Sequence, residues 1–515
     1  MNNNHTKHLW LAASASILLA GCMVGPKYHP PAATVQAPPP EYKESPTHFP
    51  DSNTWKVARP QDAMLRGKWW EIYSEPELNA LEEQLNINNQ NIKQSFENFM
   101  EARTLIAQAR SQLYPTVGTV PSYSYSGSSA NLKNSVGSTG TTGGTGSAIG
   151  TNTTSSLTIL PASVSWEPDL WGKVRNTIHE AQYNAQLSAA DLENERLTEQ
   201  ASLAVFYFEL RGQDALLKVF DATVEADEKS VELSRARFET GVDDQISLVE
   251  AEIALQSAVA NRTNLGVARA QYEHAIAVLI GALPSDFSIP VRPLDAKPPE
   301  IPIGVPSQLL ERRPDIAAAE RTMAAANAQI GIVTAAYYPN LTLTAEAGFE
   351  SSAIKNLLEW PSRFWSVGPS LSETIFDAGL RRATVNQYEA VYNADVASYR
   401  QTVLAAFQQV EDNMAAVRIL SDQIQQQRQT EQSALQYLDL ATARYETGVD
   451  QYLSVLIAQT TLLGTQQQLV TLQAQVMTSS VQLIEALGGG WDRSQLPTPS
   501  QVSQKVTKSE LQPQQ

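Results

Sequence analysis

The chain has 515 residues, of which 42% are hydrophobic and 18% charged. This composition excludes a disordered chain and, because no run of about eighteen apolar residues occurs, a helical membrane transporter. The 37 basic and 54 acidic residues give a formal net charge of −17, which argues against nucleic acid as a partner, since phosphate binding needs clustered Lys and Arg. One cysteine and six histidines leave little material for a disulfide or a metal centre, so we expect no cofactor.

Residues 1–21 have the features of a secretory signal peptide, with a short basic start and an apolar run from Leu9 to Ala20. The run is too short to span a bilayer as a permanent helix. It leads into Leu19-Ala20-Gly21-Cys22, which resembles the bacterial lipobox, whose cysteine becomes the acylated N-terminus. Met23 stands where an inner-membrane retention signal would have Asp. We therefore expect Cys22 to insert in outer-membrane lipid, where several acyl chains give stable anchoring.

The next segment, from Met23 to about Pro60, is rich in proline and has no sustained hydrophobic period. Such composition is typical of extended backbone rather than of a packed helix or strand. We expect an arm that lies against another part of the molecule.

Two segments alternate apolar and polar residues with a period of two, which predicts a β-hairpin at about 116–166 and another at about 340–376. The Gly/Ser/Thr tract Ser135–Gly150 is interpreted as a solvated loop of the first hairpin. Strands of about nine residues with one apolar face are typical of transmembrane β-strands. A half-buried strand of a soluble sandwich would show the same alternation.

Aromatic residues at the ends of these strands favour the membrane interpretation, because Trp and Tyr gather at bilayer interfaces. They are Tyr114, Trp166, Trp171, Tyr337, Tyr338, Trp360, Phe364, Trp365 and Phe376.

Two stretches of 68 residues, 173–240 and 380–447, contain no proline and predict helices of roughly 100 Å. Ordinary globular helices have about a dozen residues, so a compact domain cannot hold them. Apolar residues of the second stretch recur about every 3.55 positions, close to the coiled-coil period. A second glycine-poor run follows each stretch. We expect two antiparallel helical hairpins, with Gly241 and Gly448 capping the first helix of each.

The sequence from Ala236 to Asp243 recurs almost unchanged from Ala443 to Asp450, at an offset of 207 residues. The same offset carries Gly172 onto Gly379 and Gly281 onto Gly488. One architecture is therefore written twice, and the chain is predicted to be mainly α-helical with a transmembrane β-barrel. Its expected parts are a signal peptide at 1–21, a lipid-anchored extended arm at 22–65, a first structural repeat at 66–283, a Pro-rich equatorial linker at 284–310, a second structural repeat at 311–488 and a flexible C-terminal tail at 489–515.

Two hairpins supply only four strands, and open sheet edges cannot face hydrocarbon because each unpaired backbone group costs several kcal/mol there. Closed barrels with an interior need about eight strands. The chain must therefore oligomerise to enter a membrane. Three copies would supply twelve strands and two copies eight, and strand counting alone does not choose between them.

Several stretches of the chain resemble the TolC-like outer-membrane factors, and in particular the lipoprotein (NodT-type) branch that serves RND-type efflux pumps. The matching stretches are Cys22 to Tyr28, Trp69-Trp70 with Leu78 and Leu81, Leu309 to Ile316, Ala324 to Pro339, and the two Gly-Val-Asp turns. The resemblance implies a homotrimer with a twelve-stranded barrel in the outer membrane, continued by a twelve-helix α-barrel through the periplasm. It also implies that the helical tips dock a periplasmic membrane-fusion adaptor linked to an inner-membrane RND-type transporter.

The resemblance assigns residues to two roles at the periplasmic end. The adaptor-docking tips are Thr240, Gly241, Val242, Asp243, Thr447, Gly448, Val449 and Asp450. The family narrows its entrance with a leucine, here Leu453, which the 207 offset matches to Ile246. Ile457 and Thr460 depart from the acid and arginine usual on the following turns, whereas Glu250 matches Ile457 in the first copy. The candidate gate is therefore Leu453, Ile246 and Glu250.

Residues 221–252 carry ten acids and three bases, a net charge of −7, whereas the matching residues 428–459 carry four and two, a net charge of −2. Most such charge belongs to a solvated helix face. If the acids ring a narrow mouth, they should favour cations there.

No His-Glu-x-x-His, Walker loop or nucleophile elbow occurs, so we do not expect an enzyme. An outer-membrane duct for type I protein secretion and a structural envelope-spanning lipoprotein are the alternatives. We expect an exit duct for small molecules such as drugs and toxic compounds, because a polar-lined barrel is needed for transport and not for a tether.

Overall fold

The computed structural model describes residues 23–35, 37–44, 55–57, 67–127, 153–303 and 306–506. Cys22 and the Ser135–Gly150 tract lie outside these residues. The chain divides into two compact units. Unit 1 comprises residues 1–29, 104–182 and 324–392, and unit 2 comprises residues 30–103, 183–323 and 393–515.

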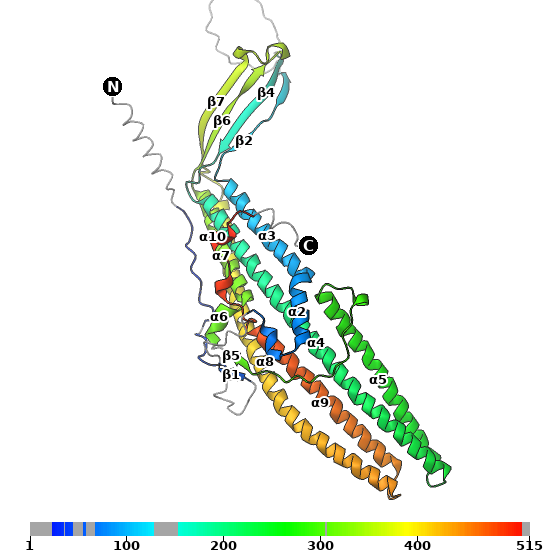
Figure 1. Ribbon diagram of the computed structural model, residues 1–515. Coiled ribbons are helices and arrows are strands. Elements are labelled where there is room, and N and C mark those ends of the chain that lie inside the picture. The colour runs from blue at the N-terminus through cyan, green and yellow to red at the C-terminus, as the bar shows by residue number, and fades with distance from the viewer. Residues whose placement is uncertain are drawn as a thin grey trace, which may run out of the picture. The chain divides into compact units, whose positions relative to one another are not determined.

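Unit 1 holds an antiparallel sheet of five strands (Figure 1). The order is β2-β4-β6-β7, and β3 also pairs with β4. Because β2 and β3 pair with successive segments of β4, they share one edge position, and the sheet has four positions across. The strands are β2 (Thr116–Gly118), β3 (Ser122–Gly127), β4 (Thr153–Trp166), β6 (Asn340–Ser351) and β7 (Arg363–Ser372).

Edge strand β7 is exposed along most of its length, and its large apolar side chains include three that are strongly exposed. Trp365, Val367 and Leu371 are 76%, 71% and 70% exposed. Such a row of large apolar side chains on a sheet edge is unusual for a protein surrounded by water and calls for an apolar environment or a partner strand. Within the described residues the other edge of the sheet, β2 with β3, is also unpaired.

Unit 2 contains most of the helical residues, and four helices contribute to both units along their length. Two helices, α4 and α8, have 67 residues each, and their successors α5 and α9 have 35 each. The predictions of very long helices and of antiparallel hairpins are confirmed. The helices are α2 (Pro76–Asn88), α3 (Gln90–Ser111), α4 (Lys173–Glu239), α5 (Gln245–Leu279), α6 (Leu309–Arg312), α7 (Pro314–Thr334), α8 (Leu380–Glu446), α9 (Tyr452–Ala486) and α10 (Pro499–Val502).

The core of unit 2 gathers around the short helix η2 (Trp69–Tyr73) and the middle of α4. Trp69 is buried and donates its indole N–H to Gln200, while the Tyr73 ring packs 5.0 Å from that of Phe208. The two-stranded parallel sheet of β1 (Trp55–Val57) and β5 (Ile301–Ile303) belongs to the same unit. These contacts cover one side of α4 with segments that lie far away in the sequence.

A buried carboxylate fixes the Pro-rich linker onto the helices. Asp214 of α4 has a fully buried side chain that forms ion pairs with Arg211 at 3.0 Å and Arg269 at 2.8 Å. It also accepts the backbone N–H of Arg292 at 2.9 Å. Because both arginines are paired and also bond linker carbonyls, the charges are compensated inside the unit.

The N-terminal arm is extended, as its proline content predicts, and its two parts belong to different units. In unit 1, Val24 donates its N–H to the Trp171 carbonyl, and Asn176 and Asn327 donate to the carbonyls of Val24 and Pro26. In unit 2, the Glu411 carboxylate on α8 accepts the backbone N–H groups of Lys43 and Glu44, and Glu44 pairs with Arg418 at 2.8 Å. The arm is therefore held by hydrogen bonds to its backbone, by the Glu44–Arg418 ion pair and by the buried side chain of Tyr42.

The C-terminal segment differs from the flexible tail that the sequence suggests, as far as residue 506. Trp491 is 7% exposed and packs with Ala190, Ala317 and Ala318. Gln186 donates a hydrogen bond to the Pro497 carbonyl at 2.7 Å. The segment has no hydrophobic period, and several separate contacts hold it, including Trp491 on a patch of alanines, the buried side chain of Val502 and the Arg493–Glu320 ion pair.

Candidate docking tips and gate

The turns that join α4 to α5 and α8 to α9 have the same geometry. Gly241 and Gly448 have φ angles of +73° and +74°, the left-handed conformation that glycine adopts without strain. At the first turn, Gly241 N–H bonds the Phe238 carbonyl and Val242 N–H bonds the Arg237 carbonyl. The second turn repeats this pattern, which is the Schellman motif expected where glycine ends a helix. Both glycines thus do cap helices.

The tips present an apolar side chain to solvent. Val242 and Val449 are 65% and 64% exposed, and nothing lies within 4 Å of a Cβ built on Gly241 or Gly448. The hydroxyls of Thr240 and Thr447 bond helix carbonyls and so do not point outward. Each tip is a small apolar knob on a rigid turn, a geometry suited to docking in a pocket of another protein.

The two tips differ in how their aspartates are bonded. Asp450 forms an exposed ion pair with Arg444 of its own hairpin at 2.6 Å. Asp243 instead accepts a hydrogen bond from the Tyr445 hydroxyl of the other hairpin at 2.8 Å and lies 3.6 Å from Arg237. The guanidinium of Arg237 stacks over the Tyr445 ring at 4.6 Å.

This cross-link between hairpins comes from one difference between the repeats. By the 207 offset Tyr445 corresponds to Phe238, and only the tyrosine has a hydroxyl that can donate a hydrogen bond. Burial raises the pKa of Asp243, but the hydrogen bonds from Tyr445, Asp244 and Ser247 and the charge of Arg237 outweigh it, so the pKa lies below its ordinary value. The contacts at the tip therefore stabilise the charged form of the Asp243 carboxylate.

A second layer of polar groups lies under this cross-link. The Tyr445 and Tyr452 rings meet edge to face at 5.5 Å, and Gln459 donates to the Ser230 hydroxyl at 3.1 Å. Asp227 of α4 is 5% exposed, and burial raises its pKa to about 6. Sequence reasoning missed Tyr445, Tyr452 and Asp227, although the change of Phe238 to Tyr445 within a repeated octapeptide was a visible signal.

Ile246 and Leu453 stand on the first turns of α5 and α9, and Glu250 stands on the second turn of α5. Ile246 and Leu453 are 65% and 46% exposed, and Glu250 is half-buried. The apolar side chains occupy matching places on the two hairpins. A second pair of exposed apolar side chains therefore lies beside the tips in sequence.

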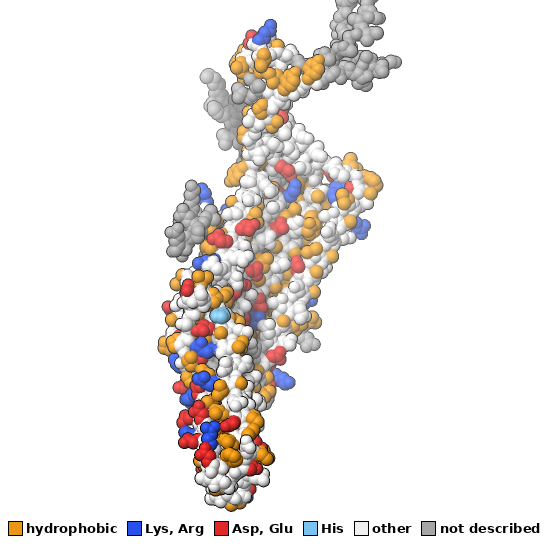
Figure 2. Space-filling model, turned by 90° about the vertical axis from the view of Figure 1, so that its right-hand side faces the viewer, with side chains coloured by type: hydrophobic (Ala, Val, Ile, Leu, Met, Phe, Trp, Pro, Cys, Tyr) orange, Lys and Arg blue, Asp and Glu red, His pale blue; other side chains and the backbone are white. Residues whose placement is uncertain are grey.

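The acids of residues 221–252 are partly compensated. Lys229 pairs with Glu225 at 2.7 Å, Arg235 with Glu252 at 3.1 Å, and Arg262 with Asp221. Figure 2 shows acidic and basic side chains interspersed at the lower end of the face in view. The surface there is mixed in sign, as on a solvated helix face.

None of the helices in the described part of the chain combines the length and apolarity needed to cross a membrane. Among the same residues, no three His, Cys, Asp or Glu side chains are placed to hold a metal ion.

Comparison with known proteins gives one consistent result. The model of the family described as outer membrane efflux protein matches residues 81–282 and 305–489. The chain is 31% identical over 488 residues to the antibiotic efflux pump outer membrane protein ArpC of Pseudomonas putida, covering 94% of this chain and 96% of that protein. It is 30% identical to outer membrane protein OprJ of Pseudomonas aeruginosa, covering 93% and 95%.

Solved structures agree with the sequence relatives. The outer-membrane channel OprN superposes with a TM-score of 0.79 at 25% identity, covering 91% of this chain and all of that chain. A membrane protein from Pseudomonas aeruginosa superposes with a TM-score of 0.77 at 27% identity, covering 92% and 98%.

Proposed function

Because the chain belongs to the outer membrane efflux protein family, we propose that it is the outer-membrane subunit of a tripartite efflux pump. In this role it is a passive exit duct for small molecules and not an enzyme. An inner-membrane RND-type transporter would supply the energy and select the substrate, and a periplasmic adaptor would join the two.

The observation that carries the proposal is the sheet of unit 1. It has four strand positions, two unpaired edges and an exposed apolar row on β7. Such a sheet is stable in lipid only when its edges are closed, so copies of the chain must share one barrel. A homotrimer gives twelve strands. Each chain has four long helices in two hairpins, α4 with α5 and α8 with α9. Three chains would then give a twelve-helix tube in the periplasm.

Two further assignments follow from this arrangement. The exposed valines of the tips, Val242 and Val449, support docking of the adaptor, and Ile246, Leu453 and Glu250 support a constriction beside them. Acylation of Cys22, outside the described residues, would anchor the arm in outer-membrane lipid. Residues 22–65 would be this arm, 284–310 an equatorial linker, and 66–283 and 311–488 the two repeats.

Reconstitution of the full-length chain tests the proposal. Detergent-purified protein should have the mass of a trimer by light scattering and should conduct ions in planar bilayers. A monomer that stays soluble without detergent after removal of the acyl chains would overturn the proposal. A tether would bind membranes but conduct no ions. A type I protein secretion duct would conduct, but deleting its gene would leave drug susceptibility unchanged.

A further inference from the structure

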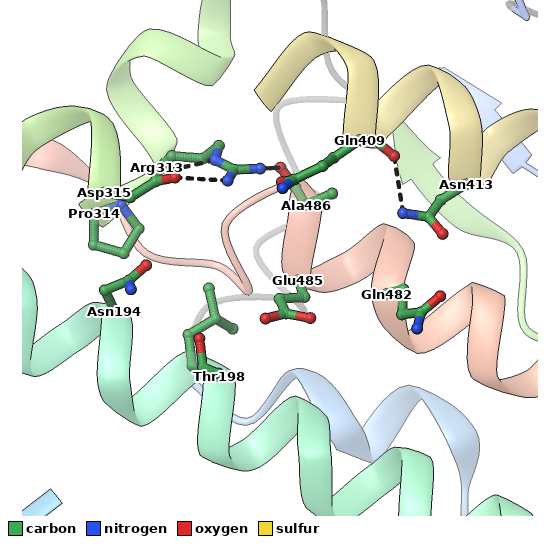
Figure 3. Close-up of a pocket in the computed structure, with 11 residues that line it drawn as sticks. Asn194, Thr198, Arg313, Pro314, Asp315, Gln409, Asn413, Gln482, Glu485 and Ala486 are labelled. Atoms are coloured by element: carbon green, nitrogen blue, oxygen red, sulfur yellow. Dashed lines mark hydrogen bonds and ion pairs between the residues drawn. The ribbon is translucent and has the colours of Figure 1, made fainter. Parts of the chain in front are cut away.

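A polar cavity lies where four helices of unit 2 meet. Its volume is about 390 Å³, and its walls come from α4, α8, the end of α9 and the start of α7 with the residue before it (Figure 3). This volume lies within the range of small-molecule sites, which is about 300–1,000 Å³. The cavity is distinct from the tips and gate, because none of its lining residues belongs to either.

Apart from Arg313, the polar side chains that line the cavity are neutral or acidic. Hydroxyl, amide and carboxylate groups converge on it, and Figure 3 shows Glu485 next to Thr198 near its centre. Among the described residues the structure records no hydrogen bond for the side-chain amides of Asn194 and Gln482, so their bonding capacity is available. The polar side chains of the lining, apart from Arg313 and Asp315, are Asn194, Thr198, Gln409, Asn413, Gln482 and Glu485.

The charges of the lining residues favour a positively charged ligand. Arg313, the one cation of the lining, is engaged by Asp315 at 2.7 Å and by the Ala486 carbonyl at 2.9 Å. The Arg313–Asp315 pair is neutral, which leaves Glu485 as the net charge of the site. Burial raises the pKa of Glu485, Arg313 and Thr198 oppose this shift without cancelling it, and the charge of Asp315 adds to it, so a bound cation would favour the charged carboxylate. An anion would find no uncommitted positive group.

The direction in which the cavity faces follows from helix geometry. On α8, Glu411 and Arg418 bind the arm and lie within about 20° of each other around the axis, at about 100° per residue. Gln409 and Asn413 lie about 160° from Glu411. On α4, Thr198 likewise lies about 160° from Gln200, which bonds Trp69. Thr198, Gln409 and Asn413 therefore face away from the arm and η2, whereas the lining residues Leu197 and Ala486 pack in the core with Trp69.

We propose that this cavity is a binding site for small organic cations that carry N–H donors, such as primary and secondary amines. This inference rests on the proposed function for its setting, because in a trimeric tube the helix faces opposite the arm and η2 line the bore. Each channel would hold three such sites. Ammonium N–H groups would donate to Glu485 and to the amide and hydroxyl oxygens around it, in charge-assisted hydrogen bonds.

Spermidine binding to the detergent-purified full-length chain, measured by calorimetry, tests the site. Glu485→Gln keeps the shape of the side chain and removes its charge, and should weaken binding about tenfold or more. Asp439→Asn removes an exposed carboxylate of α8 outside the cavity and should leave affinity unchanged. Asn194→Leu keeps Glu485 but fills the cavity with an apolar side chain, and should also abolish tight binding.

The outcomes separate this site from general attraction by a negative protein. Equal weakening by Asp439→Asn and Glu485→Gln, full affinity of Asn194→Leu, or no binding of spermidine by the wild type would each overturn the site. If Glu485→Gln fails to assemble, the binding affinity of Asn194→Leu still tests the site. Failure of the proposed function would appear elsewhere, as the absence of a trimer and of conductance in bilayers without spermidine.

Discussion

The hydroxyl of Tyr445 at the end of α8 donates a hydrogen bond to Oδ2 of Asp243 in the turn after α4, at 2.8 Å. This bond joins the tips of the two helical hairpins. Arg237 adds a contact to the same ring and donates to the Glu446 carbonyl at 3.3 Å. If the hairpins move apart when the mouth of the duct opens, these contacts must break.

Replacement of Tyr445 by Phe should weaken the link and raise the open probability of the channel in planar bilayers. The aromatic packing on Tyr452 stays, whereas a hydrogen bond to a charged group, worth about 1.5–3 kcal/mol, is lost. The matched control is Phe238→Tyr, which changes the corresponding residue of the other hairpin and leaves the bond to Asp243 in place. Equal open probabilities for wild type and Tyr445→Phe would show that the Tyr445–Asp243 hydrogen bond does not hold the channel closed.

Asp227 should make the stability of the protein depend on pH. Its pKa is about 6 in the folded state, above the usual value of about 3.9, so folding favours the protonated form. The stabilisation is complete below about pH 3.9 and is lost as pH rises to about 6. Asp227→Asn stays neutral and should unfold at a higher temperature than wild type at pH 7.5, with the difference shrinking towards pH 4.

Thermal unfolding followed by circular dichroism from pH 4 to 7.5 measures this difference. The control is Glu228→Gln, which removes the neighbouring, exposed carboxylate and should shift the curve little at any pH. If the unfolding temperatures of Asp227→Asn and wild type differ by the same amount at every pH, the Asp227 carboxyl does not cause the pH dependence.

Substitution of Gly448 by Ala tests the backbone of the tip. Alanine at a φ of +74° costs about 1–2 kcal/mol, and no steric clash adds to it because nothing lies within 4 Å of the new Cβ. The control is Gly464→Ala, in the interior of α9 and equally unobstructed, which should instead stabilise by about 0.5–1 kcal/mol. Thermal unfolding should therefore move in opposite directions, and a shared direction would contradict the strained turn.

The parts of the fold that could be predicted depend on local chemistry. Absence of proline over 68 residues predicts α4 and α8, and a glycine after each predicts the turn, because both effects act within a few residues. The polar cavity around Glu485 could not be predicted, since amides on a long helix look like an ordinary solvated face. The burial of Trp491 depends on alanines more than 170 residues away. Such contacts arise only from tertiary packing.

Exchange of the tip valines should separate docking from folding. Val242→Ser with Val449→Ser removes two apolar side chains that are 65% and 64% exposed, so the trimer should assemble and conduct as wild type. If both valines enter pockets of the adaptor, each lost burial costs about 1–2 kcal/mol, and adaptor recovered after crosslinking in cells should fall about tenfold or more. Val35→Ser, on the arm and 89% exposed, is the matched control and should recover the full amount. Unchanged recovery with the double variant would place the docking surface elsewhere than the two valines.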